Sequence, residues 1–201
     1  MVLSLSGLRL YTGAYNELLY KTTAGNLTHS AYTISDSLKS IENVSSTILA
    51  APEIQISLSA IAELNDRAAW TNANRVIINS LQTYHSSVKD NGASFLMIQN
   101  EHFHNSTYTM WKSKLSEERL QEAIEVAEQK KGAVVWIPAD PGSNALLMSR
   151  EIRKVDNLSL KHLGTLVVYV DLNNIIRKAN AAATQYSDSQ YILCSKDQKI
   201  Y

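Results

Sequence analysis

The stretch "HLGTLVVYVDLNNI", residues 162–175, joins an apolar segment to a polar one through a single acid, Asp171. After Gly164 the sequence contains a series of apolar and β-branched residues as long as one strand. This pattern predicts a buried strand over residues 163–172. The following "NNIIRKANAAATQY" is typical of a short helix. Asp is a preferred N-cap residue, so we expect Asp171 to cap that helix. Whether it also belongs to a binding site depends on the residues around it.

The segments before this stretch predict the rest of a sheet. Residues 133–138 and 145–155 are strand candidates that precede the strand at 163–172, with "ADPGSN" and "DNLS" as the turns between them. Three consecutive strands joined by short turns favour an antiparallel meander. Residues 94–99 and the partly alternating "HFHNSTYTM" add two more strands. The sequence therefore predicts an α+β fold with an antiparallel five-stranded sheet.

Helical patterns fill the first half of the chain. A stripe with steps of three and four residues runs along Ile34, Leu38, Ile41, Val44 and Ile48. Gly25 and Asn26 interrupt the pattern upstream, which leaves two alternatives, two ordinary helices or one helical stalk of about 70 Å. Pro52 ends this region, and we expect a second helix over residues 53–87. A further helix begins behind Ser116, a suitable N-cap, and ends before Gly132.

Composition excludes several classes of protein. The chain has 201 residues, 45% of them hydrophobic and 19% charged, which is typical of a folded domain. A formal net charge of zero argues against a nucleic-acid or anionic-membrane binder. The single cysteine, Cys194, excludes an internal disulfide. No apolar run reaches the roughly 18 residues that a membrane span needs.

Motifs for catalysis or metal binding are weak. No G-x-S-x-G elbow and no phosphate-binding loop occur. In "NEHFHN", His102 and His104 would share one face of a strand, but Glu101 would face the other way and no third ligand is apparent. We interpret this segment as an exposed polar strand end. The sequence thus predicts no metal, no cofactor and no catalytic residue.

A candidate ligand site remains on the predicted sheet. Arg150 interrupts one apolar strand and Asp171 ends another, while aromatic residues flank both. If these side chains converge on one face, they form a concave site for a small polar ligand. The alternative is an Arg–Asp ion pair with tryptophans in the core, and the sequence leaves both open. The candidate ligand-binding residues are Trp111, Trp136, Arg150, Tyr169 and Asp171.

The element order and four segments resemble a known family. The segments are "YTMWKSKL", "GAVVWIP", "LLMSREIRKV" and "LGTLVVYVDLNNII", with Trp111, Trp136, Gly164 and Asp171 as the matching residues. They resemble the extracytoplasmic double-Cache (PAS-like) sensor domain of YesM-type bacterial sensor histidine kinases. The final "YILCSKDQKIY" resembles the first hairpin of the membrane-proximal module of such domains.

The resemblance implies a domain organisation and a role. Residues 1–50 would form a long helical stalk, residues 51–172 the membrane-distal Cache-like sensor module, and residues 173–201 a connecting helix with the start of a truncated membrane-proximal module. Such a domain lies outside the cell membrane between transmembrane helices that this chain does not include. It would bind a small polar molecule and signal through the long helix to a histidine kinase, as part of a homodimer, without enzymatic activity of its own.

One departure from the family limits the ligand. The amino-acid-binding subset carries an Arg two positions before the equivalent of Trp111 and a Tyr just after it, where this chain has Thr109 and Lys112. We therefore expect no free amino acid. Many YesM-type systems neighbour carbohydrate-uptake genes, so a saccharide-linked signal fits the resemblance. The alternatives are a chemotaxis-receptor ectodomain, a module that docks a solute-binding protein without a pocket of its own and, last, a hydrolase with a noncontiguous site.

Overall fold

The computed structural model describes residues 2–63, 67–100, 103–154 and 160–182. Glu101, His102, Cys194 and the expected hairpin "YILCSKDQKIY" lie outside the described residues. The helices are α1 (Val2–Ala50), α2 (Pro52–Glu63), α3 (Arg67–Val88), α4 (Glu117–Gln129) and α5 (Leu172–Ala182), with 3-10 turns η1 (Lys89–Asn91) and η2 (Trp111–Ser113). The strands are β1 (Ala93–Asn100), β2 (Phe103–Ser106), β3 (Val135–Pro138), β4 (Ala145–Arg153) and β5 (His162–Asp171).

The strands form one five-stranded antiparallel sheet in the order β2-β1-β5-β4-β3. Strand β5, which ends at Asp171, lies at the centre between β1 and β4. The meander predicted for the last three strands is confirmed, because β3 pairs with β4 and β4 pairs with β5. The predicted α+β fold is therefore confirmed.

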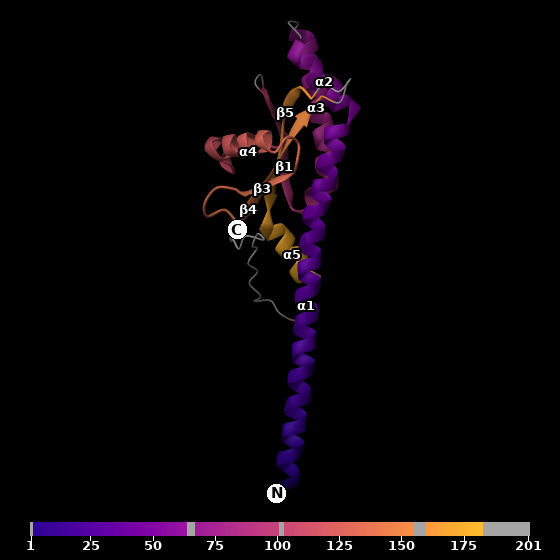
Figure 1. Ribbon diagram of the computed structural model, residues 1–201, viewed down its shortest axis with the longest axis vertical. Helices are drawn as coiled ribbons and strands as arrows, with labels where there is room; N and C mark the ends of the chain where they lie inside the picture. Colours follow the sequence, from indigo (N-terminus) through magenta and orange to yellow (C-terminus); the bar gives the residue numbers. More distant parts are fainter. Residues whose placement is uncertain (1, 64–66, 101–102, 155–159, 183–201) are drawn as a thin grey trace.

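Helix α1 is a single helix of 49 residues, which resolves the alternatives at Gly25 in favour of the stalk. Gly25 is exposed, and nothing lies within 4 Å of the position of an added Cβ, so the glycine costs helix propensity without disturbing any packing. The C-terminal part of α1 packs on the domain through Ile34, Ile41 and Ile48. Figure 1 shows the N-terminal part of α1 extending well beyond the sheet.

The region predicted as one helix over residues 53–87 is instead two helices, α2 and α3, which pack against each other. In one continuous helix, about half of the apolar side chains would lie beyond the sheet and could not pack against it. With the chain reversed, Ile54 and Leu58 of α2 enter the same core as Ile77 and Leu81 of α3. The reversal lies between Glu63, the last residue of α2, and Arg67, the first residue of α3.

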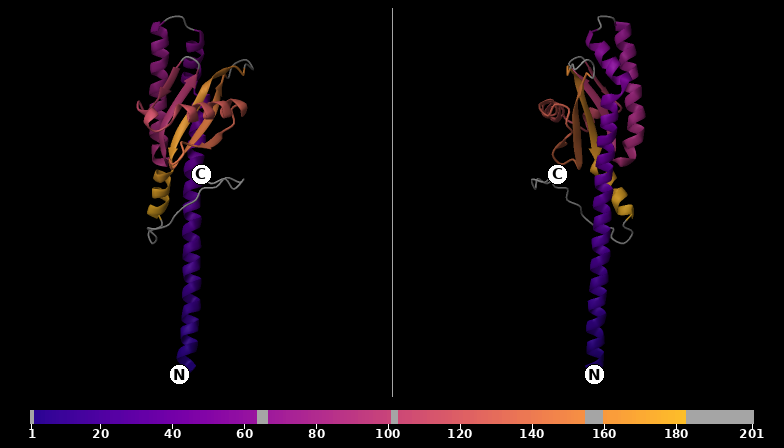
Figure 2. Two further views of the ribbon diagram at one scale, coloured as in Figure 1. Left: turned by 90° about the vertical axis from the view of Figure 1, so that its left-hand side faces the viewer. Right: turned by 45° about the vertical axis from the view of Figure 1, so that its right-hand side comes forward.

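Each side of the sheet carries its own core. We call the side covered by α1, α2, α3 and α5 the helix face, which includes Leu96, Met148 and Val168. The opposite side, the α4 face, includes Phe95, Leu147 and Tyr169. Successive residues of a strand point to opposite faces, so two-sided burial explains the continuous apolar runs of the central strands. Figure 2 shows the sheet between α4 on one side and the longer helices on the other.

Among the described residues, no single helix has both the length and the apolar character of a membrane span. Helices α1 and α2, which meet at a bend of 56°, pass that test only when taken together.

Candidate ligand-binding site

The structure divides the predicted site residues between the two faces of the sheet. Trp136 is paired with Met148 and packs against the helix-face core. Arg150 lies two residues beyond Met148 on β4 and shares that face. Tyr169 and Trp111 belong to the α4-face core. Asp171 lies two residues beyond Tyr169 and is paired with Ala145, which belongs to the same core.

The prediction that all the candidate residues converge in one site is therefore wrong for Trp136 and Arg150. An Arg150–Asp171 ion pair, the alternative left open by the sequence, is also wrong, because the two residues point to opposite sides of the sheet. The physical reason is the register between β4 and β5, in which Arg150 lies opposite Leu166 of the helix-face core.

Trp136 and Arg150 instead connect the sheet to the long helix. The indole Nε1 of Trp136 donates a hydrogen bond to Oε1 of Glu42 at 2.7 Å. One guanidinium nitrogen of Arg150 lies 2.7 Å from Oγ of Ser46 and 3.3 Å from Oγ of Ser45, while Nε donates to the carbonyl of Gly132 at 2.6 Å. Strands β3 and β4 are thus tied to α1 through polar side chains.

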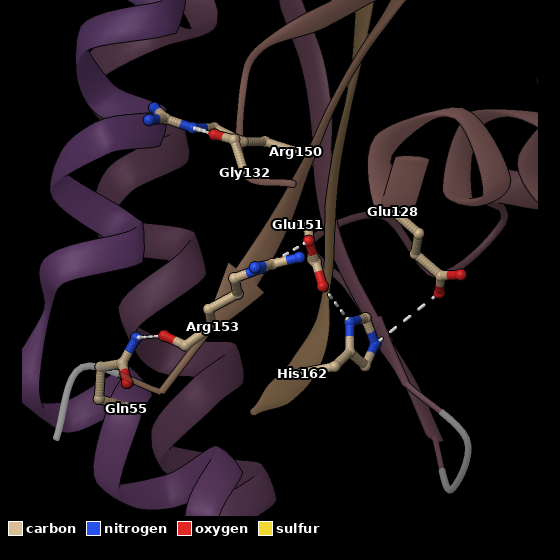
Figure 3. Close-up of polar contacts among 7 residues, drawn as sticks. All are labelled: Gln55, Glu128, Gly132, Arg150, Glu151, Arg153 and His162. Atoms are coloured by element: carbon tan, nitrogen blue, oxygen red, sulfur yellow. Dashed lines mark hydrogen bonds and ion pairs between the residues drawn. The ribbon is translucent and has the colours of Figure 1, made fainter. Parts of the chain in front are cut away.

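A buried carboxylate that was not predicted from the sequence lies next to Arg150. Figure 3 shows Arg150 and Glu151 pointing in opposite directions from β4. Glu151 is only 5% exposed, and its carboxylate accepts hydrogen bonds from Nε of Arg153 at 2.7 Å and pairs with Nδ1 of His162 at 3.1 Å. The other ring nitrogen of His162 lies 3.9 Å from Glu128 of α4. The sequence signal for this carboxylate was an acidic residue within an apolar strand that also contains two arginines. The pairs with Arg153 and His162 compensate the buried charge of Glu151, and His162 connects the end of α4 to the sheet.

Three stacked aromatic rings lie on the α4 face, and we call them the aromatic cluster: Phe95, Tyr108 and Tyr169. The ring centroids of Phe95 and Tyr169 are 5.1 Å apart with planes at 17°. Those of Phe95 and Tyr108 are 6.2 Å apart with planes at 22°. Trp111 is buried in the same core. Phe95 and Tyr169 are buried and Tyr108 is partly buried, and the two tyrosines add phenolic hydroxyl groups to this otherwise apolar cluster.

The turn between β3 and β4 brings polar groups to this cluster. Asp140 accepts hydrogen bonds from the backbone N–H of Ser116 at 2.7 Å and from its hydroxyl at 2.5 Å. Ser116 Oγ accepts from the N–H of Arg119, so the predicted N-cap of α4 is confirmed. Pro141 and Gly142, with a φ of 83°, suit a tight turn in which the hydroxyl of Ser143 donates to the carbonyl of Asp140. Asp140 and Ser143 are thereby held close to Tyr169.

Asp171 caps the following helix, as the sequence predicted. Its Oδ1 accepts a hydrogen bond from the backbone N–H of Asn173 at 2.9 Å, at the first turn of α5. Its charge also acts on Tyr169. The pKa of Tyr169 is raised above the ordinary value of 10.0, first by burial and then by the negative charges of Asp171 and Asp140, while a hydrogen bond with Ser143 opposes the rise. Both carboxylates therefore lie close enough to act on this hydroxyl.

Two lysines of the loop before α4 lie over aromatic rings. Nζ of Lys114 is 5.7 Å from the ring centroid of Tyr108 and 5.9 Å from that of Tyr169. Nζ of Lys112 is 5.5 Å from the Trp111 ring and also pairs with Glu117. Within the described part of the chain, no three His, Cys, Asp or Glu side chains gather in an arrangement that could hold a metal ion. Stacking and polar contacts are what this arrangement can provide to a ligand.

Comparison with known proteins gives one related sequence and several similar folds. No protein-family model matches the chain. The sensor histidine kinase YesM of Bacillus subtilis is 27% identical over 188 residues, which are 88% of this chain. The chain spans 31% of the length of that kinase.

Similar solved structures include domains of two bacterial chemoreceptors and a bacterial periplasmic domain. The sensory domain of the Campylobacter jejuni chemoreceptor Tlp3 matches 90% of this chain and 72% of its own, with 14% identity and a TM-score of 0.43. The ligand-binding domain of the Pseudomonas aeruginosa amino acid chemoreceptor PctC, in complex with GABA, matches 86% and 72%, with 16% identity and a TM-score of 0.45. The periplasmic domain of Vibrio cholerae LuxQ matches 78% and 70%, with 10% identity and a TM-score of 0.47. In sequence, the chain is thus similar to part of a sensor histidine kinase.

Proposed function

We propose that this chain is the extracytoplasmic ligand-sensing domain of a membrane-bound, YesM-type sensor histidine kinase. The observation that carries the proposal is the likeness in sequence to YesM along 88% of the chain. The double-Cache (PAS-like) architecture is part of the proposal, and a long helix packed on a small antiparallel sheet is consistent with it. The domain itself is not enzymatic, and the kinase lies outside this chain.

The α4 face is the better place for a small polar ligand. On the helix face, the described helices cover the sheet with apolar side chains such as Ile48, Leu58 and Leu81. On the α4 face, aromatic rings, two carboxylates and a serine hydroxyl meet around Tyr169. We therefore keep Trp111, Tyr169 and Asp171 as ligand-binding residues. Trp136 and Arg150, which point the other way, receive a different role.

That role is to couple the sheet to α1. A ligand shifts a receptor only through a difference in affinity for two states. Because Trp136 contacts Glu42 and Arg150 contacts Ser45 and Ser46, a displacement of β3 and β4 reaches the long helix directly. The exposed apolar residues of α1, among them Leu18 and Leu27, suit helix–helix contact in a homodimer.

A second candidate is a module that docks a solute-binding protein. It is favoured by the separation of Arg150 from Asp171 and by two exposed apolar side chains, Ile56 and Leu160, each 69% exposed. Both lie at one end of the sheet, because Gln55 donates to the carbonyl of Arg153 and Lys154 bonds to Lys161. A thermal-shift screen of sugars, organic acids and amines separates the candidates. A ligand at 100 times its dissociation constant adds about 2.7 kcal/mol of stability, whereas docking gives no shift in the screen.

Replacing Asp171 with serine tests the ligand site separately from the helix cap. Serine caps helices about as well as aspartate, so we expect Asp171→Ser to leave the free energy of unfolding within about 0.5 kcal/mol of wild type. Hydrogen bonds to charged groups contribute about 1.5–3 kcal/mol, so affinity for a ligand found in the screen should fall at least about tenfold. Titration calorimetry measures this loss.

Asp171→Ala is the matched variant, because it removes both the charge and the cap. We expect it to lose the same affinity and, in addition, about 1 kcal/mol of stability. If Asp171→Ser binds the ligand as tightly as wild type, Asp171 is a helix cap only and the proposed site is wrong.

A further inference from the structure

We propose that the aromatic cluster on the α4 face is a site for an organic cation, and that the ammonium group of Lys114 occupies it when no ligand is bound. This inference rests on the proposed function, because it names the class of ligand for the same site. The ligand would carry a protonated amine or a quaternary ammonium group.

The position of Lys114 carries the proposal. Its Nζ lies within 6 Å of two ring centroids at once, those of Tyr108 and Tyr169. Ring faces carry negative charge density, and an ammonium group over them is held by a cation–π interaction. Phe95 stacks with both tyrosines and holds them in place. A set of rings that already contacts one ammonium group presents the same ring faces to the ammonium group of a ligand.

Lys114 lies at the rings without an ion pair to any acidic side chain of the described residues. Lys112 pairs with Glu117 and Lys21 pairs with Glu17, but in the described residues no carboxylate forms an ion pair with Lys114. The Lys114 side chain is also exposed, so it can leave the rings without opening the core. Lys114 therefore acts as a tethered, weakly held substitute for a ligand cation.

The fixed charges near the cluster favour a cation over an anion. Asp140 and Asp171 both raise the pKa of Tyr169, so both act at close range on this position. The oxygens of Asp140 are taken by the backbone N–H and hydroxyl of Ser116. Asp171 uses Oδ1 to cap α5, and within the described part of the chain its Oδ2 accepts no hydrogen bond. Oδ2 of Asp171 is thus available to a ligand ammonium group, whereas an anion would face two carboxylates.

Occupation of the aromatic cluster by Lys114 has a measurable consequence. A ligand cation must displace Lys114 from the rings, so its apparent affinity is reduced by the fraction of molecules in which the rings are free. Removing the charge of Lys114 while keeping its alkyl chain should therefore strengthen binding of a cation. An anionic ligand held by Lys114 would respond in the opposite direction, so the sign of the effect identifies the class of ligand.

The experiment uses three probes of matched shape: choline, its neutral isostere 3,3-dimethylbutan-1-ol and the anion 3,3-dimethylbutanoate. Each is titrated into the wild-type chain, Lys114→Met and Lys114→Arg, and the ring resonances of Tyr169 are followed by NMR. We expect choline alone to bind, with an affinity about two- to fivefold higher for Lys114→Met, the range of an exposed cation–π contact. Lys114→Arg, which keeps the charge, should bind as wild type does. Lys130→Met, at the far end of α4, is the control for net charge.

The outcomes separate this inference from the proposed function. If the anion binds best and Lys114→Met weakens it, the ligand class is wrong while a ligand site at Tyr169 stands. If choline binds equally to wild type and Lys114→Met, Lys114 does not occupy the site. If no probe moves the Tyr169 resonances in any variant, the cation site is wrong, and the proposed sensing role is then tested on its own by the Asp171 variants with a ligand from the screen.

Discussion

Replacing Ile48 with alanine is expected to lower the free energy of unfolding by about 2–5 kcal/mol. Ile48 has no exposed surface and lies where α1 packs against the helix face of the sheet, in the same core as Ile54, Leu58 and Met148. Truncation removes apolar contacts and leaves a cavity that the rigid sheet cannot close. The loss measures how firmly the long helix is fixed to the domain.

Urea unfolding of Ile48→Ala, compared with Thr47→Ala, measures this effect. Thr47 is the neighbouring residue on the exposed side of α1, so its replacement should change the free energy of unfolding by no more than about 0.5 kcal/mol. Equal losses in the two variants would mean that the Ile34–Ile41–Ile48 stripe does not attach α1 to the sheet.

Replacing Phe95 with alanine is expected to cost about 3–5 kcal/mol. Phe95 is fully buried on the α4 face and stacks with Tyr108 and Tyr169, so its loss also removes the support of both tyrosine rings. The variant should therefore weaken binding of any ligand held by those rings.

Phe103→Ala is the matched control, since Phe103 is the other phenylalanine of the chain and is only partly buried, on the edge strand β2. We expect a clearly smaller loss of stability and no change in ligand affinity. Chemical unfolding and calorimetry compare the two variants. A loss for Phe103→Ala as large as that for Phe95→Ala would contradict the central position assigned to the aromatic cluster.

Much of the fold follows from local sequence signals. The strand at residues 163–172, the caps at Ser116 and Asp171 and the meander of β3, β4 and β5 all depend on neighbours in the chain. The continuity of α1 and the reversal between α2 and α3 are not determined by neighbouring residues in this way. A glycine that costs only about 1 kcal/mol cannot decide whether a helix continues, and an apolar stripe does not reveal where the chain turns back.

The site was only partly predictable for a related reason. Tyr169 and Asp171 are two residues apart on one strand, so their shared face is fixed by alternation. Arg150 lies on another strand, and its face depends on pairing with Leu166, which a shift of one residue would invert. Lys114 and Asp140 reach the cluster from loops, where no periodicity places them.

The three tryptophans offer the most direct test that the ligand binds on the α4 face while α1 packs on the other. Trp111 lies in the α4-face core, whereas Trp70 and Trp136 pack against the helix-face core. Their indole N–H resonances are recorded by NMR during titration with a ligand from the thermal-shift screen. We expect the Trp111 resonance to move, and to stay fixed in Asp171→Ser at the same ligand concentration. A Trp111 resonance that stays fixed at saturation, while Trp70 or Trp136 moves, would contradict a ligand site on the α4 face.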